Sequence, residues 1–151
     1  MINLTITSRA LAGKILHNPK YKIDFLISIG DPDRDQPSGF HRFPVSNRLK
    51  LTFFDYLPKS NQPPIHLRPY PPNIEDINRV IDFTHHKIKP VLDTQPEVLI
   101  HCEVGVSRSP AIAQIVLQEL GMTESEARDK VVAVRPQAAP NEFVLSLYRS
   151  L

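Results

Sequence analysis

The sequence predicts an α/β fold, a single domain in which a mainly parallel central sheet is flanked by helices on both faces. Short apolar runs typical of strands alternate along the chain with longer stretches of helical periodicity, which is the pattern of parallel sheets. The chain has 151 residues, of which 41% are hydrophobic and 23% charged. We therefore expect residues 1–151 to form one domain with a substantial core.

The first half of the chain is predicted to alternate between strand and helix. Residues 2–7 alternate between apolar and polar types, as a strand does, and Ser8 can cap a short helix over residues 8–16. Residues 25–29 form a continuous apolar run, typical of a central strand, and a polar loop follows over 30–39. Residues 40–43 are predicted as a brief edge strand, and residues 50–54 as a strand that ends at Asp55.

The second half of the chain is predicted to be mostly helical. It opens with a surface loop over residues 57–72, which holds six prolines, and a helix with an apolar stripe then begins near Asn73. Residues 97–101 form a strand, and the helix beyond it ends at Gly121. A capping box at residues 123–126 opens the next helix, which Pro136 closes, and residues 141–151 form the last helix.

The stretch from His101 to Ser109, HCEVGVSRS, is the most informative feature of the sequence. It links the strand at 97–101 to a helix whose first turn contains Pro110, where the missing N–H costs nothing. Cys102 therefore stands at the end of a strand, and the loop's backbone N–H groups curl toward a helix N-terminus. Such a loop is an anion-binding site, here with a sulfur at its base.

The residue types in this stretch suit a site that binds a phosphate group and attacks its phosphorus with a nucleophile. A thiol near a helix N-terminus and beside a guanidinium loses its proton readily, so the thiolate of Cys102 would be the nucleophile. Gly105 lets the loop turn without a Cβ clash, and Arg108 offers a planar pair of donors to two phosphate oxygens. Ser109 can donate its hydroxyl to the sulfur, while His101 is expected to hydrogen-bond the loop backbone.

This stretch resembles the signature loop of the cysteine-dependent protein phosphatases: His-Cys, five residues, Arg, then Ser or Thr. Its Ser-Arg-Ser ending is most similar to the dual-specificity-like branch of the protein tyrosine phosphatase superfamily. The resemblance implies a protein tyrosine phosphatase-like fold and hydrolysis through a phosphocysteine on Cys102, without a cofactor. It also implies that Arg108 clamps the phosphate and that Ser109 supplies the hydroxyl of the leaving step.

The resemblance extends to two further parts of the chain. The phosphate would be bound by the loop that runs from Cys102 to Arg108, made of Glu103, Val104, Gly105, Val106 and Ser107. The segment from Arg135-Pro136 to Asn141 is similar to the one that precedes the family's last helix, so Asn141 would help position the loop or the attacking water. A helix N-cap is the simpler interpretation of Asn141.

A general acid is needed to protonate the leaving oxygen and then to deprotonate water. Asp55 is the candidate, because it follows a predicted strand at the catalytic edge of the sheet and the resemblance implies an Asp there. Its distance from Cys102 along the chain exceeds the family pattern, since the proline-rich loop intervenes. A turn-capping role is the alternative for Asp55. Other candidates are Asp76, Asp82 and the cluster Asp31, Asp33 and Asp35, for which helix-dipole or solvated-turn roles are simpler.

The predicted substrate is a phosphorylated protein or peptide, with phosphotyrosine first and phosphoserine or phosphothreonine as further candidates. The acidic Glu103 would repel a polyphosphorylated headgroup, and the basic residues are scattered along the sequence. Three alternatives stay open. They are a phosphate-binding module with little turnover, a phosphatase for an inositol phosphate or an RNA 5′-phosphate, and sulfur transfer on a rhodanese-like fold.

Composition narrows the remaining classes. The net charge of +2 gives no general attraction to nucleic acid, and no segment is long and apolar enough to span a membrane. A single Cys excludes an internal disulfide framework and suits a reducing compartment, so we expect a cytoplasmic protein. We also expect a monomer. The six His residues form no metal-binding motif, so no metal is expected.

Overall fold

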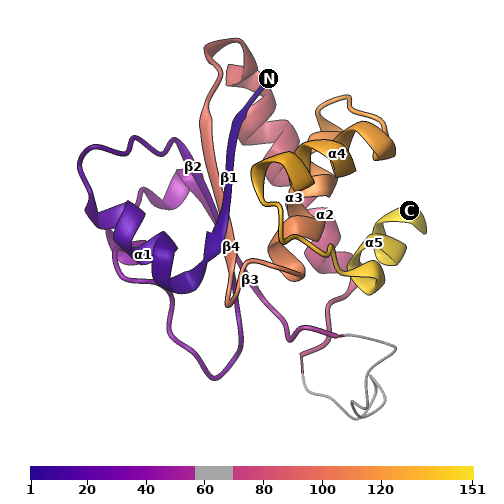
Figure 1. Ribbon diagram of the computed structural model, residues 1–151, viewed down its shortest axis with the longest axis horizontal. Coiled ribbons are helices and arrows are strands. Elements are labelled where there is room, and N and C mark those ends of the chain that lie inside the picture. The colour runs from indigo at the N-terminus through magenta and orange to yellow at the C-terminus, as the bar shows by residue number, and fades with distance from the viewer. Residues whose placement is uncertain (57–69) are drawn as a thin grey trace.

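The computed structural model describes residues 1–56 and 70–151. In these residues four parallel strands form a sheet at the centre of the molecule (Figure 1). The strands lie in the order β1-β4-β2-β3 and all pair in parallel, which confirms the predicted α/β class. Their bounds are Asn3–Ser8 (β1), Phe25–Gly30 (β2), Arg48–Thr52 (β3) and Glu97–Cys102 (β4).

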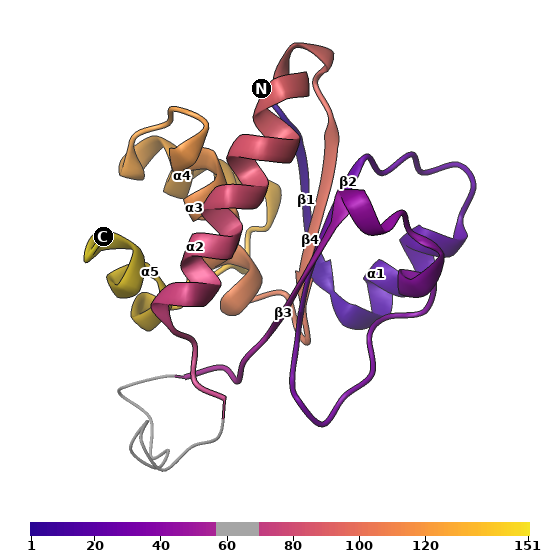
Figure 2. The ribbon, with the colours of Figure 1, turned by 180° about the vertical axis from the view of Figure 1, so that it is seen from behind.

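Helices cover both faces of this sheet, as predicted, but unequally (Figures 1 and 2). One face carries α1 (Arg9–His17) and the loops that follow β2, and four α-helices of the described residues lie on the other. Those four are α2 (Ile74–Phe83), α3 (Arg108–Glu119), α4 (Glu124–Val134) and α5 (Glu142–Arg149). No helix among the described residues is long and apolar enough to cross a membrane.

The central strand β4 is buried on both faces, which explains the apolar run of residues 98–100 within it. Leu99 packs with the α1 layer, whereas Val98, Ile100 and Cys102 belong to the core cluster on the side of α3. Successive side chains of a strand point to opposite faces. Cys102 is therefore directed to the α3 face, and its neighbour His101 to the α1 face.

The predicted helix starts are confirmed by side-chain caps. Ser8 Oγ accepts a hydrogen bond from the Leu11 N–H at 3.2 Å, and capping boxes open α2 at Asn73 and α4 at Thr123. Asn141 caps α5, accepting from the Val144 N–H at 3.0 Å. Each cap satisfies a backbone donor that the first helical turn would otherwise leave without a partner.

Residues 40–43 are not the predicted edge strand. Residues 40–42 form a short 3-10 helix, entered through Gly39 in the left-handed conformation with φ 89°. Its anchor is Phe40, which is buried against Ala12 and Ile15 of α1. A single buried aromatic fixes this segment, so an apolar residue that suggested a strand belongs to a tight turn instead.

β3 runs over Arg48–Thr52 where residues 50–54 were predicted, and the helix from Asn73 is not α-helical throughout. β3 ends at Thr52, because Phe53 N–H still bonds Gly30 of β2 but Phe54 N–H turns away to the Tyr70 carbonyl. The helix from Asn73 ends as α-helix at Phe83 and continues as a π-helical turn over residues 84–88 and 3-10 turns to residue 94. Most of the predicted surface loop over 57–72 lies outside the described residues.

Replacing Ile100 by Ala should destabilise the fold strongly. Ile100 is fully buried in β4 and pairs with Ile6 of β1 and Ile27 of β2, so the truncation leaves a cavity that the sheet cannot close. We expect the free energy of unfolding to fall by about 2–5 kcal/mol in urea titrations. The control Val132→Ala changes a side chain that is 42% exposed and should cost less than about 1 kcal/mol. Similar losses for both variants would contradict this picture of the core.

Candidate active site

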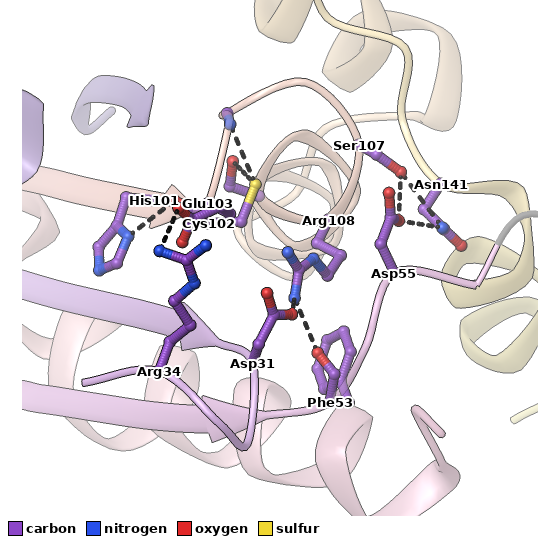
Figure 3. A network of polar contacts seen from close by, with 12 residues as sticks. Asp31, Arg34, Phe53, Asp55, His101, Cys102, Glu103, Ser107, Arg108 and Asn141 are labelled. Atoms are coloured by element: carbon purple, nitrogen blue, oxygen red, sulfur yellow. Dashed lines mark hydrogen bonds and ion pairs between the residues drawn. The ribbon is translucent and has the colours of Figure 1, made fainter. Parts of the chain in front are cut away.

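The candidate site lies at the carboxyl end of β4, between Cys102 and Arg108 (Figure 3). Cys102 is the last residue of β4 and Arg108 the first of α3, so residues 103–107 form the loop between them. The side chains at both ends are nearly buried, at 2% and 5% exposure. Ligand sites of parallel sheets lie at this edge, where strands end and helices begin.

The loop has its carbonyl groups turned outward. Arg9 N–H donates to the Glu103 carbonyl at 3.1 Å, and the Arg135 guanidinium donates to the carbonyls of Val104 (3.0 Å) and Gly105 (3.1 Å). Ala139 N–H bonds Val106 at 2.8 Å, and Asn141 N–H bonds Ser107 at 3.0 Å. With every carbonyl of residues 103–107 held from outside, the N–H side of the loop is left to face the sulfur.

Gly105 is the residue that allows this turn. Its φ is +81°, in the left-handed region, and a Cβ at this position would lie 2.6 Å from the Thr7 carbonyl carbon and 2.7 Å from its oxygen. The end of β1 therefore packs directly against the loop. Any larger residue would have to displace backbone on one side or the other.

Two groups lie within hydrogen-bond distance of the sulfur of Cys102. Gly105 N–H lies 3.2 Å from Sγ, and Ser109 Oγ lies 3.1 Å from it, on a side chain that is fully buried. Both groups would stabilise negative charge on the sulfur. The geometry thus places Ser109 where a hydroxyl could assist a departing thiolate.

Arg108 is held by the protein along one edge only. Its Nη1 donates to Asp31 Oδ1 at 2.6 Å and to the Phe53 carbonyl at 2.8 Å. Among residues 1–56 and 70–151 these are its hydrogen bonds, so the edge formed by Nε and Nη2 is available for two oxygens of a phosphate. Asp31, one of the alternative acids, thus lies against the guanidinium, a contact that the sequence did not reveal.

His101 lies on the other face of β4 and holds the backbone at Cys102. Its Nδ1 is 3.1 Å from the Cys102 carbonyl, and its Nε2 is 2.7 Å from Ser28 Oγ. Because a carbonyl can only accept, Nδ1 carries the proton and Nε2 accepts from the Ser28 hydroxyl. Burial is the main reason that the pKa of His101 falls from 6.5 to about 4, so the ring is neutral at pH 7.

Asp55 is brought beside the loop from the segment that follows β3. Its Oδ1 accepts hydrogen bonds from Ser107 Oγ at 2.7 Å and from Asn141 Nδ2 at 2.8 Å. Asn141 Nδ2 also donates to the Tyr56 carbonyl at 2.8 Å. Asn141 therefore does two things at once: it caps α5 and fixes the segment that carries the acid candidate.

The remaining acid candidates are not at this site. Asp76 belongs to the capping box of α2, and Asp82 is exposed on the same helix. Asp33 and Asp35 are exposed in the loop after β2. Among the described residues, no group of three or more His, Cys, Asp or Glu side chains could hold a metal ion.

Two arginines at the site were not singled out as functional by sequence reasoning. Arg135 was noted only as part of a short similar segment, and its role in holding two loop carbonyls depends on the end of α4 lying over the loop. Arg34 lies 3.8 Å from the Glu103 carboxylate, from a loop whose course the sequence did not predict. The one sequence signal that could have pointed to Arg34 is its place in a polar loop directly after β2.

Comparison with solved structures supports the fold. Human DUSP28 matches with a TM-score of 0.67 and 17% identity, over 97% of this chain and 89% of that chain. The PTP-2 phosphatase of Cydia pomonella matches with a TM-score of 0.67 and 16% identity, over 98% and 84%. A human tyrosine phosphatase-like serine/threonine/tyrosine-interacting protein matches with a TM-score of 0.59 and 21% identity, over 87% and 77%.

These likenesses show that the chain has the protein tyrosine phosphatase-like fold that the sequence predicted. No family model matches the sequence, and no curated protein does. At such low identities the shared fold does not decide the activity.

Replacing Gly105 by Ala should disrupt the loop, because the new Cβ would overlap the Thr7 backbone at a φ of +81°. We expect a loss of about 1–3 kcal/mol in the free energy of unfolding and the loss of the thermal stabilisation that vanadate gives. Gly30→Ala is the matched control, since nothing lies within 4 Å of its added Cβ. A Gly105→Ala protein that still binds vanadate like wild type would contradict the described geometry.

His101 should make stability depend on pH between about 4 and 6.5. In this range His101 binds a proton in the unfolded chain but not in the folded one. Its contribution to the free energy of unfolding is therefore fully present above pH 6.5 and is lost as the pH falls toward 4. The loss should be on the order of 3 kcal/mol. Urea titrations at several pH values measure it. His101→Asn should flatten the slope while His86→Asn, an exposed control, keeps it; an unchanged slope in His101→Asn would show another group to be responsible.

Proposed function

We propose that this chain is a metal-independent phosphomonoester hydrolase that acts on phosphorylated proteins through a phosphocysteine on Cys102. One observation carries the proposal: three chemically matched groups from different elements meet at one loop. They are the sulfur of Cys102 from β4, the guanidinium of Arg108 from α3 and the carboxyl of Asp55 from the segment after β3. A nucleophile, an anion clamp and an acid are what phosphate-ester cleavage requires.

In the first step the Cys102 thiolate attacks phosphorus, so that a P–S bond forms and the P–O bond to the leaving group breaks. Arg108 and the loop N–H groups bind the three remaining oxygens, whose charge would otherwise oppose the attack of an anion. Asp55, protonated, gives its proton to the departing oxygen. The protein residue leaves as a neutral phenol or alcohol.

In the second step water attacks phosphorus and the P–S bond breaks. Asp55, now a carboxylate, takes a proton from the water, and the Ser109 hydroxyl donates to the thiolate as it leaves. Inorganic phosphate departs and the enzyme returns to its starting state. The Arg108 guanidinium and the N–H dipoles of the loop stabilise the negative charge of the transition state, so the proposed chemistry requires no metal.

Phosphotyrosine is the substrate that the surroundings of Asp55 favour. Tyr56, the next residue, packs edge-to-face on Phe143 of α5 with ring centroids 4.8 Å apart. An aromatic pair that adjoins the acid along the chain suits a phenyl ring in the leaving group. The same two steps could also hydrolyse phosphoserine and phosphothreonine.

Hydrolysis of para-nitrophenyl phosphate and of a phosphotyrosine peptide, both in EDTA, tests the proposal. Wild type should release phosphate from both, and Cys102→Ser from neither, because a serine hydroxyl is a far weaker nucleophile than a thiolate. Asp55→Ala should lose about 10²–10⁴-fold in kcat on the peptide. Its loss on para-nitrophenyl phosphate should be smaller, because nitrophenolate leaves without a proton.

Asp33→Ala is the matched control, since Asp33 is an exposed aspartate of the neighbouring loop, and it should behave like wild type. Equal losses of Asp55→Ala on both substrates would reject Asp55 as the acid. A wild-type protein that binds vanadate but hydrolyses neither substrate would instead be a phosphate-binding module.

A further inference from the structure

The loop after β2 carries an arginine, Arg34, to the rim of the candidate site. Asp31 at its start is bonded to Arg108, and Arg34 N–H closes a turn onto the Asp31 carbonyl at 3.1 Å. On the other side of the turn, Arg9 Nε donates to the Asp35 carbonyl at 2.7 Å. Arg34 is therefore presented from a short turn that is held at both ends by other elements.

The Arg34 side chain reaches the first residue of the phosphate-binding loop. Its Nη1 lies 3.8 Å from Glu103 Oε1, and its side chain is 57% exposed against 32% for Glu103. Figure 3 shows Arg34 on the Glu103 side of Cys102, while Asp55 lies on the other side, beyond Arg108. Within the described part of the chain, Glu103 is its only charged side-chain partner.

This contact changes the electrostatics of the rim. Glu103 is the only acidic residue between Cys102 and Arg108, and alone it would repel a second negative charge on the substrate. Arg34 offsets that charge. At 3.8 Å and with both side chains partly exposed, the Arg34–Glu103 ion pair is weak. An anionic group of the substrate can therefore replace Glu103 beside Arg34 with little loss of free energy. A guanidinium suits this exchange, since its planar donors fit a carboxylate or a phosphoryl group.

We propose that Arg34 is a specificity-determining residue, one that pairs with a second anionic group on the substrate. This inference rests on the proposed function, because it assumes a phosphotyrosine substrate. The second anionic group is a carboxylate or phosphoryl group on a residue that flanks the phosphotyrosine. Glu103 competes with that group for Arg34 and sets how strongly the preference is expressed. Arg34 therefore strengthens the preference for a second anionic group on the substrate, and Glu103 weakens it.

Three phosphotyrosine peptides of equal length test this, with Gln, Glu or phosphoserine next to the phosphotyrosine. Binding is measured in the Cys102→Ser background by fluorescence anisotropy, so the result does not depend on turnover. The Glu peptide should bind about two- to fivefold more tightly than the Gln peptide, and the phosphoserine peptide at least as tightly as the Glu peptide. Arg34→Gln should abolish the preference, and Glu103→Gln should increase it.

Arg128→Gln removes the same charge from an exposed position of α4 and should leave the preference intact. Equal binding of the three peptides by the Cys102→Ser protein would overturn the inference, as would an Arg34→Gln variant that weakens all three by the same factor. The second result would mean that Arg34 only braces the loop. Turnover of the peptides by the protein with Cys102 intact is scored separately, and its absence would overturn the proposed function while the binding preference stood.

Discussion

The outward orientation of five consecutive carbonyl groups is the constraint on which the site depends. A loop can present its N–H groups to an anion only if its carbonyls find partners elsewhere, because buried peptide groups without hydrogen bonds are costly. Here the partners come from three distant places: the start of α1, the end of α4 and the segment before α5. These donors are Arg9, Arg135, Ala139 and Asn141. The packing of the helices around β4 is thus what gives the loop its shape.

The strand β3 links Arg108, the proposed phosphate clamp, to Asp55, the proposed acid. Phe53, immediately beyond β3, accepts a hydrogen bond from Arg108, and Asp55, two residues later, accepts from Ser107 and Asn141. The position of the guanidinium and the position of the carboxyl are therefore set by one short segment. Asp31 completes the arrangement, since a guanidinium that is only 5% exposed needs a counter-charge when no phosphate is bound.

The sequence predicted the elements that depend on short-range interactions. Helix caps at Ser8, Asn73 and Thr123 have short-range partners, and the apolar runs of the strands reflect burial on both sides, so these elements could be located in advance. Residues 40–43 could not, because one buried aromatic and a left-handed glycine outweigh their strand-like composition. The sequence predicted Cys102 and Arg108 on one loop, and it predicted Asp55 near that loop from two signals, the end of a strand and the resemblance. The contacts of Asp31, Arg34 and Arg135 depend on how distant elements meet.

The strand order explains which loops can reach a substrate at Cys102. In the order β1-β4-β2-β3 the sulfur-bearing strand lies between β1 and β2, with β3 next to β2. The end of β1 is occupied in packing against Gly105, so it has no room for a substrate. The segments after β2 and β3 remain, and these carry Arg34 and Asp55 to different sides of the sulfur. Backbone donors of the loop would bind any phosphate alike, so the proposed preferences between substrates depend on side chains at its rim, and these two segments supply two of them, Arg34 and Asp55.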